Sequence, residues 1–235
     1  MKVIILCGGR GIRAFPFTES LPKPMLPIGG SPMLMHIISG FLAQGFTDFV
    51  LAAGYRRQVI EDYFERKEIG ARINTLDTGE NVDTGDRILA CKDLVGETFL
   101  ATYGDGLCDV SLRRLLDFHE HHEGLATITS VPLITQYGVL ETDGSDRVLE
   151  IREKPVLRQH WINVGFFVFR RRVFDHWDGR SLEREVFPNL ARKGLLFTYK
   201  HEGFFKSMDS YKDQQDFDEL ARSSQPPWRL AQTGR

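Results

Sequence analysis

A glycine-rich segment near the start of the chain has the composition of a phosphate-binding loop. Gly8, Gly9 and Gly11 follow the apolar run 3–7. Glycines let backbone N–H groups approach phosphate oxygens without interference from side chains. The first thirty residues also carry several basic side chains against the single acid Glu19, in a chain whose formal net charge is -2. This local basic cluster is the first candidate for binding a polyanion.

Lys23 is the basic residue of this region whose backbone is most restrained. It lies between Pro22 and Pro24, in a proline-rich stretch that continues to Gly30. Because proline restrains the backbone on both sides of Lys23, the ammonium group is held in a defined position, as binding to a polyphosphate would require. A lysine on a proline-rich surface loop is the alternative interpretation.

The glycine segment also satisfies, formally, the fingerprint of dinucleotide-binding oxidoreductases. The match is Gly9-x-Gly11-x-x-Ala14. That fingerprint requires a helix that begins at the glycines, yet Pro16 would lie inside its first turns. The end of the second predicted strand, Ala53-Gly54-Tyr55, carries no acid that could bind a ribose. The dinucleotide interpretation is therefore disfavoured.

Asp105 follows the apolar run 99–103 and is expected at the carboxyl end of a strand, where open α/β sheets bind their ligands. Gly104-Asp105-Gly106 could equally be a tight turn, since all three residues favour turns. The run His119-Glu120-His121-His122 could suggest a metal site, but it lacks two histidines spaced i and i+4 on its predicted helix. We interpret it as an ordinary charged helical stretch.

The elements that must position these residues alternate between strand and helix. Buried strands are predicted at 3–7, 49–53, 73–76, 99–103, 126–131 and 166–169, and helices at 33–44, 58–65 and 112–121. The alternation predicts an α/β fold: a Rossmann-like, doubly wound, mainly parallel mixed sheet in a three-layer α/β/α arrangement. Residues 137–155 break the pattern and predict a small β-hairpin, interpreted as a lid over the second substrate.

Composition limits the remaining possibilities. A chain of 235 residues with 42% hydrophobic side chains suits one domain, predicted at 1–222, followed by a loosely packed tail at 223–235. The estimated pI of 6.4 gives no global attraction to nucleic acid or to an anionic membrane. The widely spaced cysteines Cys7, Cys91 and Cys108 favour a reduced, cytoplasmic protein, and the opening apolar run is too short for a secretion signal.

Taken together, several motifs resemble those of the sugar-phosphate nucleotidyltransferases, and in particular of the glucose-1-phosphate cytidylyltransferase group. The likeness spans most of residues 1–228. It rests on Gly8-Gly9-x-Gly11-x-Arg13, Pro22-Lys23-Pro24-Met25, Asp77-Thr78-Gly79, Thr84-Gly85-x-Arg87, Tyr103-Gly104-Asp105-Gly106, Glu153-Lys154-Pro155, Ile162-Asn163-x-Gly165, Gly203-Phe204-Phe205, Met208-Asp209 and Pro227-Trp228.

The resemblance implies an enzyme that couples a nucleoside triphosphate to a phosphorylated acceptor, with Mg²⁺ as cofactor and pyrophosphate as the second product. It assigns the catalytic roles to Arg13, Lys23, Asp105 and Asp209, with the two aspartates as metal ligands. It assigns nucleotide binding to Leu6, Gly8, Gly9, Gly11, Arg13, Lys23, Gly79, Thr84, Gly85 and Gly104. It assigns acceptor binding to Gly138, Glu153, Lys154 and Asn163. A homo-oligomer is also implied.

Four departures from the family pattern affect substrate choice. Ile12 replaces a threonine, Ala14 replaces a leucine, and the insertion that follows Phe64 in the cytidylyltransferases is missing. Val164 replaces a glycine, so its side chain is expected to intrude near the acceptor pocket. CTP is the favoured nucleotide and a sugar 1-phosphate the favoured acceptor. UTP, dTTP or GTP, a non-sugar phosphate acceptor, and a non-catalytic subunit that binds sugar nucleotides remain as alternatives.

Overall fold

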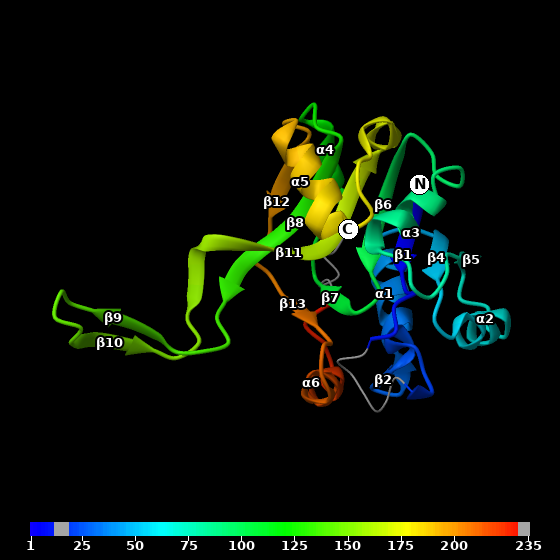
Figure 1. The fold of residues 1–235 in the computed structure, drawn as a ribbon. Coiled ribbons are helices and arrows are strands. Elements are labelled where there is room, and N and C mark those ends of the chain that lie inside the picture. The colour runs from blue at the N-terminus through cyan, green and yellow to red at the C-terminus, as the bar shows by residue number, and fades with distance from the viewer. Residues whose placement is uncertain (12–18, 230–235) are drawn as a thin grey trace, which may run out of the picture.

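The computed structural model of the protein describes residues 1–11 and 19–229. A seven-stranded sheet with the order β12-β8-β11-β6-β1-β4-β5 runs through the molecule (Figure 1). Its strands are β1 (Lys2–Leu6), β4 (Asp48–Ala53), β5 (Arg72–Asp77), β6 (Thr98–Tyr103), β8 (Ala126–Ile134), β11 (Val156–Arg170) and β12 (Leu196–Lys200). Two-stranded ribbons are formed by β2 (Pro27–Ile28) with β3 (Ser31–Pro32), β7 (Gly106–Cys108) with β13 (Phe205–Ser207), and β9 (Val139–Thr142) with β10 (Val148–Arg152).

The sheet is mixed and mostly parallel, as the sequence predicts. β1 pairs in parallel with β4 and with β6, β4 with β5, and β8 with β12. Only β11 runs against its neighbours, β6 and β8, among the described strands of this sheet. The α-helices are α1 (Met33–Leu42), α2 (Arg57–Glu65), α3 (Thr84–Ala90), α4 (Leu112–Glu120), α5 (Phe187–Arg192) and α6 (Tyr211–Ala221).

Both faces of the sheet are covered by helices, which confirms the predicted three layers. Val3 and Ile5 of β1 face a core shared with α1, α2 and α4, whereas Ile4 and Leu6 face a second core shared with α3 and α5. Successive strand residues point to opposite faces, so a strand covered on both sides must be apolar throughout. This explains why β1 is a continuous apolar run. Across residues 1–11 and 19–229, no helix combines the length and apolar character that a membrane span requires.

The predicted hairpin is present as β9 and β10, which pair antiparallel. It extends away from the seven-stranded sheet as an arm, instead of lying over the edge where β1 and β6 end (Figure 1). The cause is the length of β8 and β11, whose pairing continues through Leu157↔Leu133 to Val156↔Ile134 and carries the hairpin outward.

The predicted tail is described for residues 223–229, and only part of it is packed: 223–225 and 229 are exposed, whereas Pro226 and Trp228 are buried. Trp228 is only 5% exposed and packs edge-on against His36 and Phe217, with ring centroids 5.7 and 5.6 Å apart. Burial of a tryptophan side chain removes a large apolar area from water, so this segment contributes to the core. The boundary at residue 222 stays a prediction.

Candidate active site

A cavity of about 250 Å³ lies at the carboxyl ends of β1 and β6. The last residues of the two strands, Leu6 and Tyr103, are paired in register. From β1 the chain continues to β4 on one side of β1 and returns to β6 on the other side, so the strand order reverses at β1. Open α/β sheets bind their ligands at the point where the strand order reverses. The predicted residues that line the cavity are Leu6, Gly8, Gly9, Gly11, Lys23, Thr84, Gly104 and Asp105.

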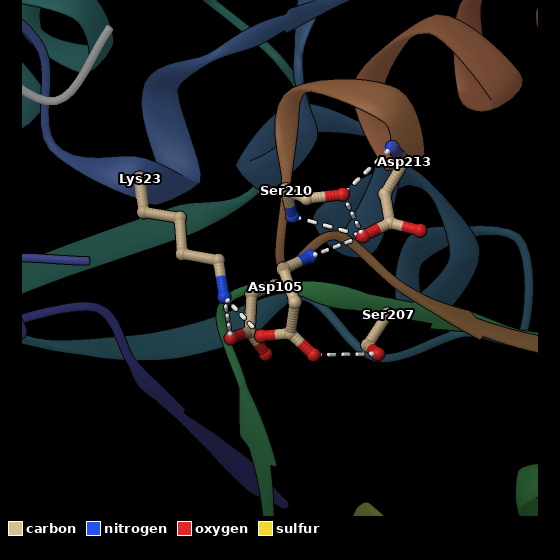
Figure 2. Close-up of polar contacts among 6 residues, drawn as sticks. Lys23, Asp105, Ser207, Ser210 and Asp213 are labelled. Carbon is tan, nitrogen blue, oxygen red and sulfur yellow. Dashed lines mark hydrogen bonds and ion pairs between the residues drawn. The ribbon is translucent and has the colours of Figure 1, made fainter. Parts of the chain in front are cut away.

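Lys23, Asp105 and Asp209 converge on one point at this cavity. The Lys23 Nζ atom lies 2.7 Å from Oδ2 of Asp105 and 2.9 Å from Oδ1 of Asp209, so the ammonium group donates to both carboxylates (Figure 2). The backbone supports this meeting, because the N–H of Met208 donates to the carbonyl of Asp105 at 2.8 Å. Three residues from distant parts of the sequence therefore form a single charged cluster, although their catalytic and metal-binding roles stay predictions.

The position of Lys23 depends on its local backbone. Lys23 begins a short 3-10 turn (Lys23–Met25) after Pro22, and the residue is only 7% exposed. Gly11 has a φ of +61°, and a Cβ at that position would lie 2.7 Å from the Cβ of Lys23. A glycine is therefore needed at position 11 both for its backbone conformation and for the close approach of the lysine stem.

Asp209 is held by the residues that begin α6. Ser207 donates its hydroxyl to Asp209 Oδ2 at 3.2 Å, and the N–H of Asp209 donates to Asp213 Oδ2 at 3.1 Å (Figure 2). Asp213 and Ser210 form a capping box at this helix end, each side chain accepting from the backbone N–H of the other. The capping box fixes the backbone from which the Asp209 carboxylate reaches Lys23.

Arg87 of α3 also lines the cavity, although no role for it could be assigned from the sequence. The residue is 3% exposed, and its guanidinium donates to the Thr78 hydroxyl, to the carbonyl of Gly79 at 2.8 Å and to that of Glu80 at 3.2 Å. A Cβ on Gly8 would lie 1.9 Å from Arg87 Nη1. Gly8 thus makes room for an arginine that joins the glycine segment to the loop before α3.

The remaining predicted nucleotide residues lie around this arginine or outside the described part of the chain. Gly79 presents its carbonyl to Arg87. Gly85 packs against the backbone of Arg180, where a Cβ would lie 2.5 Å from the carbonyl oxygen. Neither glycine is among the residues that line the cavity. Arg13, together with Ile12 and Ala14, falls within 12–18, outside the described residues.

Tyr103 connects the cavity to one of the predicted acceptor residues. Its phenol donates to the Glu183 carboxylate and accepts from the Asn163 amide at 3.4 Å. Burial, with the nearby Glu183 charge, raises the pKa of Tyr103, so the phenol stays protonated. Gly165 has a φ of +81°, and a Cβ there would lie 2.1 Å from the Tyr103 ring. The role of Tyr103 could not be identified from the sequence, because an aromatic residue at a strand end is ordinarily part of the core.

The other predicted acceptor residues lie on the arm. Gly138 lies beside Glu153, since a Cβ on this glycine would be 3.2 Å from Glu153 Oε2, and Lys154 follows β10 at an exposed position. Val164 was expected to intrude on the acceptor pocket, but it is 3% exposed. The expectation is therefore corrected: its side chain is buried, because β11 turns it inward next to the bulge between Asn163 and Phe167.

His119 and His122 both contact one hydroxyl in the packed layer under α4. His119 Nδ1 and His122 Nε2 each lie 2.8 Å from the Thr127 hydroxyl oxygen, and Arg170 donates to the carbonyls of both histidines. His119 is 1% exposed. Burial, with the charge of Arg170, lowers the pKa of His119 to about 3. These contacts fit the structural role that the sequence favours for this segment.

The lowered pKa of His119 predicts a loss of stability in mild acid. In the unfolded chain the pKa of His119 is near 6.5. Below that pH the unfolded chain therefore binds a proton that the folded chain does not. The stabilisation present above pH 6.5 is lost as pH falls toward 3. Between pH 7.5 and 5.5 the unfolding free energy in urea should fall by about 1 kcal/mol more in the wild type than in His119→Gln. His160→Gln, at an exposed position, is the control and should keep the wild-type difference. Equal pH dependence in His119→Gln and the wild type would contradict the assignment.

Comparison with known proteins identifies relatives of one chemical class. The sequence profile of the nucleotidyl transferase family matches residues 2–194. A probable glucose-1-phosphate cytidylyltransferase of Bacillus subtilis is 34% identical over 98% of this chain and 100% of its own length. A mannose-1-phosphate guanyltransferase of Gibberella zeae is 35% identical over 91% of this chain and 62% of its own length.

Solved structures share the fold at lower identity. A putative glucose-1-phosphate thymidylyltransferase from Bacillus anthracis, solved with sucrose, superposes with a TM-score of 0.75 at 21% identity, covering 96% of each chain. A UDP-glucose pyrophosphorylase from Acinetobacter baumannii superposes with a TM-score of 0.73 at 18% identity, covering 92% of this chain and 91% of the other. These structures confirm the α/β architecture, with the mixed sheet and its two helical layers.

Proposed function

This chain belongs to the sugar-phosphate nucleotidyltransferase family, and within that family we propose that it transfers CMP from CTP to a sugar 1-phosphate and releases pyrophosphate. The observation that carries the proposal is the convergence of Lys23, Asp105 and Asp209 at the cavity beside the glycine segment. A buried lysine and two acids at one point suit a polyanion that is bound together with a cation.

The proposed reaction needs positioning and charge neutralisation more than it needs a general base. A phosphate monoester has a second pKa near 6, so the acceptor phosphate is already mostly dianionic at neutral pH and can attack the α-phosphorus directly. The pyrophosphate departs in line with this attack. Lys23 offsets negative charge on the triphosphate, and the backbone N–H groups of the Gly8–Gly11 segment bind its oxygens.

Asp105 and Asp209 fit Mg²⁺ by the chemistry of their donor atoms. Their carboxylate oxygens come from two segments and meet at one cation, the Lys23 ammonium, at 2.7 and 2.9 Å. Hard carboxylate oxygens, completed by phosphate oxygens and water, are the ligands that Mg²⁺ prefers. Bound there, Mg²⁺ would supply positive charge to the triphosphate and to the departing pyrophosphate. Lys23 would then turn its ammonium from the carboxylates toward the phosphate oxygens.

The acceptor is assigned to the side of the cavity where Asn163 contacts Tyr103. Asn163 would bind a sugar hydroxyl, and the family resemblance assigns Glu153 and Lys154, at the base of the arm, to the same acceptor. Lys154 has a φ of +46°, an unusual conformation for a residue with a side chain, and it immediately precedes Pro155. Strained backbone is concentrated at functional sites, so this conformation supports a role for Lys154 in binding the acceptor phosphate.

Replacement of Lys154 should separate the two substrates. Lys154→Ala is expected to raise the KM for the sugar 1-phosphate by at least about tenfold, because a charged hydrogen bond to phosphate contributes about 1.5 to 3 kcal/mol. The KM for CTP should change less than about threefold. Initial rates with each substrate varied in turn measure both constants. Lys193→Ala, an exposed lysine at the end of α5, is the control, and a larger effect on CTP than on the acceptor would mean that the pockets are exchanged.

CTP is favoured because the relatives that match over nearly their whole length, in Bacillus subtilis and in Salmonella typhi, are named as glucose-1-phosphate cytidylyltransferases. The guanyltransferase relatives match over a smaller share of their own length. Glucose 1-phosphate is the first acceptor to test on the same grounds. The choice of base rests on these names and on no contact in the cavity.

A pyrophosphate-release assay tests the proposed function. CTP, UTP, dTTP and GTP are each paired with glucose 1-phosphate, mannose 1-phosphate and a set of non-sugar phosphates, with Mg²⁺ present. The highest kcat/KM is expected for CTP with a hexose 1-phosphate. A preference for another triphosphate would keep the reaction and change the base. Tight binding of a sugar nucleotide with no turnover in any combination would instead favour a non-catalytic regulatory subunit.

A further inference from the structure

A cluster of one cysteine, one aspartate and one histidine lies at the far end of the β7–β13 ribbon from Asp105 and Asp209. Cys108 ends β7, Asp109 follows it, and His201 follows β12. The Cys108 Sγ atom, a carboxylate oxygen of Asp109 and a ring nitrogen of His201 all lie within 4.8 Å of one another. His201 Nε2 and Asp109 Oδ1 are 2.6 Å apart. The proposed transfer reaction uses none of these side chains.

The backbone around the cluster is fixed before any ligand arrives. Cys108 is paired with Phe205 across the ribbon, the N–H of Asp109 donates to the carbonyl of Phe204 at 3.2 Å, and the N–H of His201 donates to that of Ser130 at 2.8 Å. A Cβ on Gly203 would lie 2.4 Å from Asp109 Oδ1 and 2.6 Å from the His201 ring. The chain therefore passes close to the pair at Gly203, where a side chain would have to displace the Asp109 carboxylate or the His201 ring.

The cluster is also accessible. The side chains of Asp109 and His201 are 29% and 15% exposed, and Cys108 borders an apolar cavity of about 360 Å³ between α1 and β7. Asp109 and His201 therefore face solvent in part, and Cys108 is intermediate in burial.

From this arrangement we propose that Cys108, Asp109 and His201 form a binding site for Zn²⁺ or a similar borderline divalent ion, with a fourth position left for water or another ligand. One thiolate, one imidazole and one carboxylate are the donors that Zn²⁺ prefers, whereas Mg²⁺ prefers oxygen alone. Metal–ligand distances of about 2.0 to 2.3 Å place tetrahedral ligand atoms roughly 3.3 to 3.6 Å apart. Donor atoms that already lie within 4.8 Å reach this spacing with small side-chain movements.

Binding couples to proton release. The form of cysteine that binds a metal is the thiolate. The thiol therefore loses its proton to the buffer as the metal–sulfur bond forms, and affinity increases with pH. The site would also join β7 to the segment before β13, and so stabilise the ribbon that carries Asp105 and Asp209 at its other end.

Co²⁺ is a suitable spectroscopic probe, because only a thiolate ligand gives a sulfur-to-cobalt charge-transfer absorption. The full-length, reduced, chelator-treated protein is titrated with Co²⁺. One equivalent per chain should produce this absorption, one equivalent of Zn²⁺ should remove it, and a large excess of Mg²⁺ should leave it. The wild type should also gain thermal stability with Zn²⁺.

Matched variants decide between this site and other cobalt sites. Cys108→Ser should abolish the absorption, whereas Cys91→Ser, a buried cysteine elsewhere, should keep it. His201→Gln and Asp109→Asn should each weaken Co²⁺ binding by at least about tenfold. Asp105→Asn should retain the absorption, so a failure of the proposed reaction does not affect this test. Absence of the absorption in the wild type, or its survival in Cys108→Ser, would overturn the proposal. If Cys108→Ser does not fold, an unchanged affinity of His201→Gln for Co²⁺ would also overturn it.

Discussion

Asp105→Asn is expected to lower kcat by roughly 10²- to 10⁴-fold while the affinity for CTP stays within about tenfold of the wild type. Asparagine keeps the size of the side chain and one oxygen, but it removes the negative charge that the Lys23 ammonium contacts at 2.7 Å. In the proposed reaction this charge holds the cation that neutralises the departing pyrophosphate, and such neutralisation acts mainly on the transition state. A loss of about 3 to 5 kcal/mol corresponds to the expected range of rates. Pyrophosphate release at saturating substrates and calorimetry with CTP measure the two quantities.

Asp93→Asn is the matched control for this change. Asp93 is an exposed acid in an ion pair with Arg171, and its replacement should leave kcat within about twofold. Near-normal turnover in Asp105→Asn would refute the role of Asp105 as a metal ligand. Complete loss of CTP binding would instead show that the carboxylate acts on the ground state.

The position of Asp105 in the fold could be predicted because the neighbouring strands are simple to recognise. β1 and β6 are covered on both faces, and this burial requires an uninterrupted apolar run in each. Residues that directly follow such a run must lie where the strand ends, at the carboxyl ends of the parallel strands, whichever turn they form. The parallel pairing of Leu6 with Tyr103 then brings the glycine segment and Asp105 to the same edge.

Residues whose role depends on distant contacts could not be found in this way. Arg87 is buried because Gly8 has no side chain and because carbonyl groups of the loop before α3 accept its hydrogen bonds. The residues next to Arg87 in the sequence reveal neither contact. The place of Asp209 beside Asp105 was implied only by the family resemblance. In the structure it follows from the pairing of Gly106 with Ser207 and from the capping box of α6.

The course of the arm was not predictable from local patterns either. The turn 142–145 identifies the hairpin, but its direction is set by how far the pairing of β8 with β11 continues beyond the sheet. Within β11, which runs from Val156 to Arg170, only the segment Phe166–Phe169 was predicted as strand. The half of β11 nearer the arm is mostly exposed and contains both polar and apolar side chains, so it lacks the apolar run that marks a buried strand.

Lys23→Met should lower kcat/KM by roughly 10²- to 10³-fold, since removal of one preorganised donor to developing charge has effects of this size. The same variant should be destabilised without a divalent ion, because Asp105 and Asp209 lose the ammonium that separates them. Their carboxylates are 31% and 38% exposed, so solvent screening limits the loss to on the order of 1 kcal/mol, or roughly 2 to 4 °C in Tm.

Mg²⁺ distinguishes this explanation from a general loss of packing around Lys23. In the wild type the ammonium and a divalent ion compete for the same two carboxylates, so Mg²⁺ without nucleotide should raise Tm only slightly. In Lys23→Met the competitor is absent, and Mg²⁺ should recover most of the lost stability by mass action. Lys2→Met removes a surface lysine that lies 3.8 Å from Asp48 and should show neither effect. If Mg²⁺ stabilised Lys23→Met no more than the wild type, the carboxylates would not form a cation site, and the charge pairing of Lys23 would be structural alone.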